Sequence, residues 1–511
     1  MAGQGLRQYL NDVSPYLILL IAVSTLGSLQ FGYHLGELNA PQDVITCHKK
    51  SISALLRIRE MVSSSHPSDK SSGLLSECIP MTEAAFATVS SIFTLGGLFG
   101  ALCAGPFSSS RGRLLAMRAT AVLYLVGAAV ETIAGSVFLM ALGRLVSGVG
   151  AGASTVVVPL YISEIAPLNA RGLFGAMTQI SINVGILIAQ TLGYFWSYGS
   201  AWRWILGVGV CVATAQAVGL FVVPESPSWL AANGEVTAAK RTLQRIRGSG
   251  HDISEETETW NSVEHGNSEE EGLLHADPMA DPVEPVIAKS PAHLGFIDVV
   301  KDPLTRPAII AVVGIMFVQQ FCGINSIIMY SVSLLADLLP VSSALLTILI
   351  SVVNLVTTVA CSPLPDRLGR KTCLLMSVIG QGSSALALAL SIVFGFKILS
   401  AVAVLFFVGF YAVGLGPVPF ILASELVGQE AVGATQSWCL GANYVASFLV
   451  AQFFPIINKA LNNLLGGHGG WVYFIFAGMA GLSVMFVSVN VPESKGKRDA
   501  DEVWGRTRRA D

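Results

Sequence analysis

The chain has 511 residues, of which 52% are hydrophobic and only 12% are charged. Soluble proteins carry roughly 25% charged residues, so this composition, with a mean hydropathy of +0.63, excludes an ordinary water-soluble enzyme and a disordered chain. The 30 basic and 33 acidic residues balance one another, which excludes a nucleic-acid binder because no cationic face remains. The remaining class is a polytopic membrane protein.

Long apolar stretches recur along the chain, each close to the roughly 20 residues that a helix needs to cross a bilayer. Barrel strands are shorter and alternate in polarity, so we expect an all-α polytopic membrane protein with twelve transmembrane helices. In chain order the expected helices are 15–37, 84–107, 114–138, 139–162, 173–197, 203–223, 307–332, 340–362, 372–394, 398–423, 435–457 and 471–491. Abundant glycine lets such helices approach closely, as in Gly96, Gly97, Gly100, Gly148, Gly150 and Gly152.

Basic residues concentrate in alternate loops between these stretches and in the C-terminal tail. They include Arg111, Arg113, Arg171, Arg367, Arg370, Lys371, Lys495, Lys497 and Arg498. Because short cytosolic loops are enriched in Lys and Arg, both termini and the loop between the sixth and seventh helices are expected in the cytosol. The loop 38–83 is also basic, but its length allows it to cross as a small outer subdomain.

Two of the eight cysteines, Cys47 and Cys78, fall in the loop 38–83. Disulfides persist in the oxidising environment that an outer loop meets. The sequence leaves a disulfide between them and two free thiols equally open. The other six lie in or beside expected helices, where a buried thiol is an ordinary core residue.

The chain repeats itself weakly in its second half. Three landmarks recur in the same order: Gly112-Arg113 and Gly369-Arg370, Pro159 to Glu164 and Pro419 to Glu425, Pro224-Glu225-Ser226 and Pro492-Glu493-Ser494. Duplicated six-helix halves are typical of secondary carriers, which place the substrate site between the halves. We therefore expect halves at 1–223 and 307–491 and a cytosolic tail at 492–511.

The segment 224–306 is expected to be a cytosolic linker between the halves. Residues 234–248 have the pattern of a short basic helix, whereas 252–284 hold eleven acidic residues and no Lys or Arg. Such a stretch is expected to be disordered.

Several motifs in order along the chain carry a family resemblance. They are Gly27 to Tyr33, Gly143-Arg144, Pro159 to Glu164 with Arg171-Gly172, Pro224 to Leu230, Gln319 to Asn325, Asp366 to Lys371, and Val491 to Gly496. With these motifs the sequence resembles the sugar porters of the major facilitator superfamily, the group that contains the facilitative glucose transporters. The resemblance covers every expected helix. It implies the major facilitator fold and alternating-access transport of a hexose or similar sugar, with no enzymatic chemistry, cofactor or metal.

A sugar has many hydroxyls and no net charge, so neutral amides that both donate and accept suit it. Buried in a membrane, an unpartnered amide is costly and needs a reason. The resemblance implies sugar contacts from amides and from pocket aromatics: Gln179, Gln319, Gln320, Asn325, Asn354, Asn443, Phe31, Tyr330 and Phe420. Hydrogen bonding between helices is the alternative use of such amides, and we assign Gln190 to it.

Charged residues lie at the expected cytosolic helix ends of both halves. They are Glu164, Arg171, Glu225, Asp366, Arg370, Glu425 and Glu493. We expect them to pair across the halves as a latch that holds the outward-open state and breaks on inward opening. The alternative is that they only fix topology and loop packing.

Energy coupling depends on His34 and Arg144. The resemblance implies that proton-coupled members carry an aspartate at position 34, near the arginine matching Arg144, whereas uniporters carry a neutral residue. Histidine can titrate near neutral pH, but a neighbouring arginine disfavours its charged form. Facilitated diffusion is therefore our first expectation, and proton-coupled symport through His34 is the alternative.

Some positions depart from the family pattern. Ala412 replaces an acidic residue, Phe420 and Tyr444 replace tryptophans, and Ser109 and Leu114 interrupt the first copy of the loop motif. These losses thin the expected latch and keep open a different class of function, a sugar sensor that binds without transport.

The acidic linker contains a short pattern of the kind that sorting adaptors read. Glu269-Glu270-Glu271-Gly272-Leu273-Leu274 fits an acidic dileucine signal, with Glu269, Leu273 and Leu274 as its main residues. A chance match is the alternative, because short motifs occur often. The membrane is therefore expected to be the plasma membrane or a vacuolar or endosomal membrane.

Overall fold

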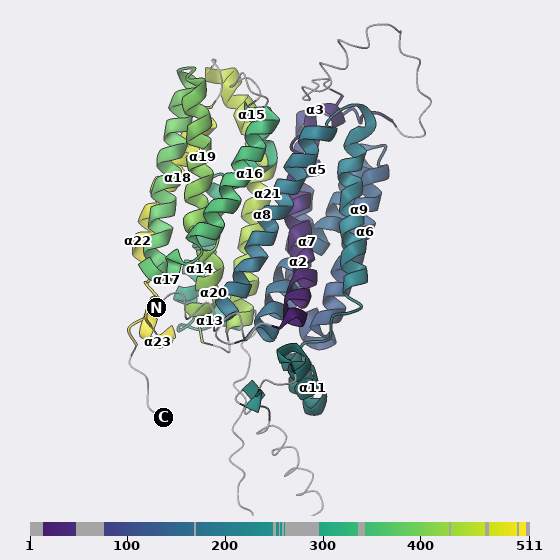
Figure 1. Ribbon diagram of the computed structural model, residues 1–511. Helices are drawn as coiled ribbons and strands as arrows, with labels where there is room; N and C mark the ends of the chain where they lie inside the picture. The colour runs from purple at the N-terminus through teal and green to yellow at the C-terminus, as the bar shows by residue number, and fades with distance from the viewer. Residues whose placement is uncertain are drawn as a thin grey trace, which may run out of the picture.

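The computed structural model describes residues 14–47, 76–167, 170–248, 296–335, 343–428, 431–465, 470–497 and 500–506, and short stretches within 252–260, without the side chains of 171–173 and 333–335. This part of the chain contains helices and no strand. Twelve of its helical segments are long and apolar enough to cross a membrane, which confirms the expected all-α polytopic fold (Figure 1).

Six spans form the first half. They are α2 (Pro15–Gly36), α5 (Glu83–Arg111), α6 (Arg113–Ile133), α7 (Val137–Ile165), α8 (Arg171–Trp196) and α9 (Trp202–Gly219), with a 3-10 turn, η2, at Gly199–Ala201. The third span was expected to reach 138, but α6 ends at Ile133. The reason is local, since Ser136 caps α7 and its Oγ accepts from Leu139 N at 3.3 Å.

Six spans form the second half, and two of them are broken. They are α14 (Arg306–Phe321) with α15 (Ile324–Leu335), α16 (Ser343–Cys361), α18 (Arg370–Val393), α19 (Lys397–Val413) with α20 (Val418–Glu425), α21 (Val432–Leu465) and α22 (Val472–Asn490). Shorter helices are α3 (Gln42–Ile45), α10 (Pro227–Ala232), α11 (Val236–Arg247), α13 (Asp298–Lys301), α17 (Leu364–Leu368) and α23 (Ala500–Val503).

The two breaks follow from glycine and proline. Gly323 has φ 95°, in the left-handed region that favours glycine, and it separates α14 from α15. Gly414 and Pro417 lie between α19 and α20, where proline cannot continue the helix bond ladder. Each expected span is thus two helices that leave backbone groups without a helical partner.

The halves lie side by side (Figure 1), and they meet where α5 packs on α21 and α8 packs on α16. The division at residues 223 and 307 remains a prediction. One end of the bundle carries α3 and the disulfide, and we call it the disulfide end. The other carries α11, and we call it the α11 end.

Each end of the bundle bears out a local expectation. Cys47 and Cys78 form a disulfide, so the first of the two open alternatives is confirmed. The basic pattern at 234–248 forms α11, which docks on the first half as Ser14 Oγ donates to Ile246 O at 2.5 Å and Arg247 Nη1 donates to Ile165 O at 2.7 Å.

Glycine brings α5 and α7 into backbone contact. A methyl group built on Gly152 would lie 1.8 Å from Gly97 O, and one on Gly100 would lie 2.0 Å from Val149 O. Helices that touch through their backbones gain dispersion contacts that larger residues exclude. The expected role of the glycines in packing is thereby confirmed for this helix pair.

Replacing Gly152 by alanine is expected to lower the stability of the purified chain. The overlap with Gly97 O forces α5 and α7 apart, and overpacking of this kind costs about 1–3 kcal/mol. The measurement is the melting temperature in detergent, followed by size-exclusion chromatography. Gly105→Ala is the matched control, because a methyl group there meets no atom within 4 Å. Equal melting temperatures for the two variants contradict the packing argument.

Candidate functional site

Three of the predicted sugar-binding amides meet at the break between α19 and α20. Gln319 Nε2 donates to Leu415 O at 2.6 Å, and Asn443 Nδ2 donates to Gln319 Oε1 at 2.5 Å. Gln320 Nε2 lies 3.5 Å from the same Oε1. Gln319 thus satisfies a backbone carbonyl that the broken helix exposes, and both ends of its amide are used within the protein.

Two predicted amides keep capacity for a ligand. The side-chain oxygen of Gln320 is buried without a hydrogen-bond partner. Asn325, only 6% exposed, makes no side-chain hydrogen bond within the described part of the chain. Gln320 lies one residue before the end of α14 and Asn325 one residue after the start of α15, so the break at Gly323 lies between them.

The other two amides join a hydrogen-bonded chain that crosses between the halves. Gln179 Nε2 donates to Asn183 Oδ1 at 3.3 Å, and Asn183 Nδ2 donates to Thr358 Oγ1 at 2.8 Å. Thr358 Oγ1 lies 3.4 Å from Asn354 Oδ1. Asn183 and Thr358 were not among the residues predicted from the sequence, although an asparagine four residues after Gln179 falls on the same helix face.

Two of the three predicted aromatics lie together at the interface. Phe31 stacks on Phe93 with centroids 6.2 Å apart and meets the edge of Tyr444 at 6.4 Å. Phe31 and Phe420 both pack against the small cluster that contains Tyr444. Tyr330 lies elsewhere, with its hydroxyl donating to Ala451 O at 2.8 Å.

Polar contacts between the halves lie at the disulfide end and at mid-depth. Asn39 Nδ2 donates to Ile328 O and to Ser331 Oγ, both at 2.9 Å. Ser91 Oγ donates to Gln452 Oε1 at 2.7 Å, and Thr155 Oγ1 lies 3.1 Å from Tyr444 Oη. Among the described residues, no hydrogen bond or ion pair joins the two halves at the α11 end.

The predicted latch charges pair within each half, which differs from the expected pairing across the halves. In the first half, Glu164 Oε1 lies 2.8 Å from Nη2 of Arg113, a residue that was not among the predicted latch charges. In the second, Arg370 Nη2 lies 2.8 Å from Glu425 Oε1 and 2.9 Å from Asp366 Oδ1. Each arginine starts a helix beside the end of its neighbour, so the partner within the half is nearer.

The side chain of Arg171 lies outside the described residues, as do Glu269, Leu273 and Leu274 of the predicted sorting signal. The structure therefore leaves both assignments as predictions.

Glu225 and Glu493 cap the start of a helix in their own half. Glu225 Oε1 accepts from the backbone N–H of Arg113 at 2.8 Å, and Glu493 Oε1 accepts from that of Arg370 at 2.8 Å. A carboxylate at a helix N-terminus satisfies free N–H groups and meets the positive end of the dipole. The repeated landmarks are therefore one capping arrangement used twice.

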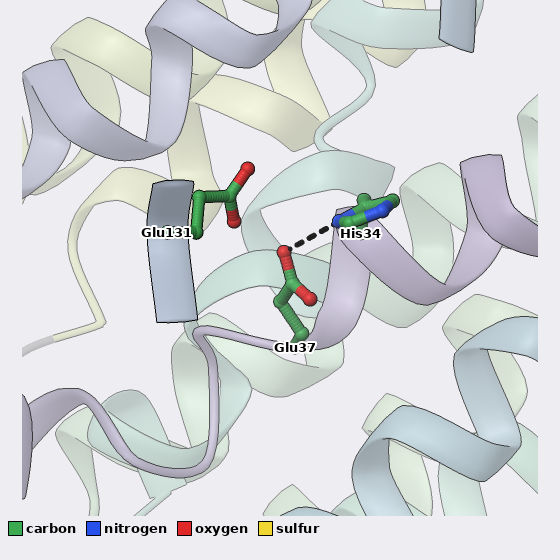
Figure 2. A group of neighbouring side chains, drawn as sticks. All are labelled: His34, Glu37 and Glu131. Atoms are coloured by element: carbon green, nitrogen blue, oxygen red, sulfur yellow. Dashed lines mark hydrogen bonds and ion pairs between the residues drawn. The ribbon is translucent and has the colours of Figure 1, made fainter. Parts of the chain in front are cut away.

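A cluster of buried ionisable residues surrounds His34. His34 Nδ1 lies 2.8 Å from Glu37 Oε1, and Arg144 Nη1 donates to the same Oε1 and to His34 O, both at 2.7 Å. Glu131 Oε1 accepts from Ser147 Oγ at 2.6 Å. Figure 2 shows Glu131 pointing from α6 toward His34 and Glu37. Arg144 therefore lies beside His34, as the resemblance implies.

Glu37 and Glu131 were not among the residues predicted from the sequence. The signal was present, because Glu131 is an acidic residue inside an expected membrane helix, and ionisable residues there are rare and functional. Averaging over a long apolar window hides one such residue.

A family model described as "Sugar (and other) transporter" matches residues 20–502. The chain belongs to this sugar transporter family. Among its relatives, the probable metabolite transport protein YBR241C of Saccharomyces cerevisiae is 33% identical over 510 residues, 99% of this chain and 98% of the relative. Vacuolar protein sorting-associated protein 73 of the same yeast is 31% identical and covers 96% of each chain.

Animal members of the sugar transporter family are similar at comparable length. Facilitated glucose transporter member 3 of Rattus norvegicus is 30% identical over 502 residues, 96% of this chain and 92% of the relative. Among solved structures, the partially occluded inward-open xylose transporter XylE of E. coli superposes with a TM-score of 0.70 at 22% identity, covering 95% of this chain and all of that one. The fold is thus the major facilitator fold.

Replacing Gln319 by leucine is expected to destabilise the chain. The change removes the donor to Leu415 O and the 2.5 Å acceptor of Asn443 Nδ2, which keeps only its 3.5 Å contact with Met316 Sδ. A buried unpaired group such as Leu415 O costs about 1–3 kcal/mol. The melting temperature of purified Gln319→Leu is the measurement. Asn325→Leu is the control, since its amide makes no bond in the described structure. If Gln319→Leu lowers the melting temperature less than Asn325→Leu does, the structural role of Gln319 at the helix break is contradicted.

Proposed function

We propose that this chain carries a hexose or similar sugar across a membrane by alternating access, with Gln320 and Asn325 as its main sugar-binding amides. The observation that carries the proposal is their unused hydrogen-bonding capacity. Gln320 Oε1 is buried without a partner, and Asn325 is 6% exposed without a bond in the described structure. Sugar hydroxyls supply both donors and acceptors to such groups.

The remaining predicted amides have supporting roles. Gln319 and Asn443 hold the helix break in place, and so they orient Gln320 beside them. Gln179 and Asn354 belong to the chain through Asn183 and Thr358. This chain crosses between the halves, so its bonds change when the halves rock.

The contacts between the halves support an inward-facing state, given the predicted orientation with the disulfide end outside. Asn39 closes that end through Ile328 and Ser331. In this state the arginines Arg113 and Arg370 pair within their halves. A latch across the halves then belongs to the outward-facing state, in which the α11 ends approach.

Transport assays test the proposal. Purified chain in liposomes preloaded with D-glucose is expected to take up radiolabelled D-glucose by counterflow, which needs no energy source. Gln320→Ala and Asn325→Ala are each expected to raise the half-saturating concentration about tenfold, the effect of losing about 1.4 kcal/mol of hydrogen bonding. The control is Gln381→Ala, a buried glutamine of α18 whose amide atoms also have no partner.

Three outcomes decide between the candidate functions. Uptake that the two variants reduce and the control does not supports the carrier. Binding of D-glucose without counterflow contradicts transport and favours the sensor. If the chain shows no binding and no counterflow with either D-glucose or D-xylose, the proposal that its substrate is a hexose or similar sugar is contradicted.

We further propose that the membrane is vacuolar or endosomal and that sorting adaptors read Glu269, Leu273 and Leu274. The similarity to a vacuolar protein sorting-associated protein supports this. A fluorescently tagged Leu273→Ala, Leu274→Ala double variant is expected to move to the plasma membrane. An Ile253→Ala, Val263→Ala variant in the same linker is the control. A double variant distributed like the unmodified chain contradicts the signal.

A further inference from the structure

The charges of the cluster around His34 do not balance. Arg144 has a fixed positive charge, whereas Glu37 and Glu131 bring two carboxyls. These residues and His34 are 0–1% exposed. With both carboxyls ionised and His34 neutral, one negative charge remains uncompensated, which is costly within a membrane. One added proton makes the cluster neutral.

We propose that Glu37 and Glu131 form a binding site for one proton, shared between their carboxyls, and that this proton travels with the sugar. This rests on the proposed function, because it assigns a coupling ion to that carrier. Binding forms one O–H bond on a carboxylate with a proton taken from water, and release breaks it on the other side of the membrane. Symport thus replaces facilitated diffusion, and the proton lies on the carboxyl pair instead of His34.

The geometry disfavours His34 as the carrier of the proton. Its Nδ1 already faces Glu37 Oε1 at 2.8 Å, so a neutral ring donates from this nitrogen. A charged ring must also donate from Nε2, which is buried without a partner. Gly209 and the ring of Tyr124, stacked at 5.4 Å, are its neighbours, and the Arg144 cation already bonds to His34 O.

The carboxyl pair, by contrast, has two oxygen atoms that are free to take the one proton. Glu37 Oε2 and Glu131 Oε2 are both buried without a hydrogen-bond partner. A ligand nitrogen of His34 and one carboxylate oxygen from each glutamate lie within 4.8 Å of one another. Two carboxyls this close disfavour ionisation of both and favour a shared proton.

The other titratable groups around the cluster are engaged elsewhere. Tyr33 donates to Ile205 O, Tyr124 to Gly27 O at 3.1 Å, and Tyr330 to Ala451 O. On α9, Arg203 donates to the backbone oxygens of Thr132 and Ser76 at 2.8 and 3.0 Å. Within the described structure, Arg203 makes no ion pair with the two glutamates.

A divalent metal fits the cluster less well than a proton. The oxygen nearest His34, Glu37 Oε1, is already bonded to Arg144 Nη1 at 2.7 Å. A metal ion on that oxygen has to lie against the guanidinium charge, and like charges repel strongly where water is absent. A proton can instead go to Glu37 Oε2, which has no hydrogen-bond partner, or to Glu131 Oε2, which lies 3.9 Å from Arg144 Nη1; on either oxygen it neutralises a carboxylate without bringing a second cation of ionic size against the guanidinium.

A ladder of rings links the carboxyl pair to the proposed sugar site. The Arg144 guanidinium carbon lies 4.4 Å above the Phe93 ring, Phe93 stacks on Phe31, and Phe31 meets Tyr444 of the second half. Rocking of the halves moves Tyr444 relative to Phe31. The ladder transmits this movement to Arg144, which opens the buried site to one side and lets the proton exchange.

The test compares proton-driven accumulation of D-glucose with counterflow on the same vesicles. An outside medium more acidic by one pH unit is expected to give up to about tenfold accumulation for one proton per sugar, since each 1.4 kcal/mol is a factor of ten. The ratio of accumulation to counterflow is expected to fall about tenfold in Glu131→Gln and in Glu37→Gln. Glu235→Gln, at an exposed site before α11, is the control.

The outcomes separate this inference from the proposed function. Counterflow without accumulation or sugar-dependent proton uptake in the unmodified chain overturns the proton site and leaves the carrier. Accumulation of D-glucose that is driven by a sodium or manganese gradient also overturns the carboxyl pair as the coupling site. So does accumulation that is lost in His34→Gln but kept in both glutamate variants. No counterflow means that the proposed function itself has failed. If the glutamate variants do not fold, proton uptake on adding D-glucose to the unmodified chain decides.

Discussion

A polar group inside a membrane bundle has no water to bond to, so each buried donor or acceptor needs a partner in the protein. This constraint governs the second half, where the span from Lys397 to Glu425 is interrupted. The break leaves Leu415 outside a helix, but Gln319 donates to its carbonyl and Ser377 Oγ accepts from its N–H at 3.0 Å. Several buried polar atoms nevertheless stay unpartnered within the described residues. The proposed sugar site rests on that of Gln320, and the proposed proton site rests on those of Glu37 and Glu131.

The same constraint explains the matched ends of the two halves. Helices α6 and α18 each begin with an arginine whose backbone N–H needs an acceptor, and Glu225 and Glu493 provide it. Both arrangements require a glycine with positive φ before the arginine, Gly112 at 97° and Gly369 at 105°. A methyl group on either would lie 2.3 or 2.4 Å from the capping carboxylate. The Gly-Arg and Pro-Glu-Ser motifs thus occur in both halves because the same backbone geometry requires them, although the residues around them differ between the halves.

Sequence predicts the helices well because a membrane span needs a long apolar run, and such a run is visible without neighbours. It predicts less about contacts that depend on which side chains of other helices lie opposite. The break at Gly323 lies inside a stretch that the sequence predicts as one span, between the polar pairs Gln319-Gln320 and Asn325-Ser326. The link between Gln179 and Asn354 depends on Asn183 and Thr358, which come from different helices. The pairing of the latch charges within each half depends on which helix ends lie side by side, and no sequence pattern specifies this. Glu131 can be read directly in the sequence, but one acidic residue hardly changes the mean hydropathy of a long apolar stretch.

The contacts within and between the halves differ in kind, and this difference determines where the molecule can move. Within the first half, Gly152 and Gly100 place backbone against backbone, so α5 and α7 cannot slide without losing many dispersion contacts together. Between the halves, side-chain bonds such as those of Asn39 predominate, each worth only about 1 kcal/mol. Contacts of these two kinds favour movement of the halves against each other over movement of α5 against α7. The carboxyl pair lies inside the first half and is joined to the interface through the contacts of Arg144 with Phe93 and of Phe93 with Phe31, so the proposed proton site has a packed connection to the surface on which the halves meet.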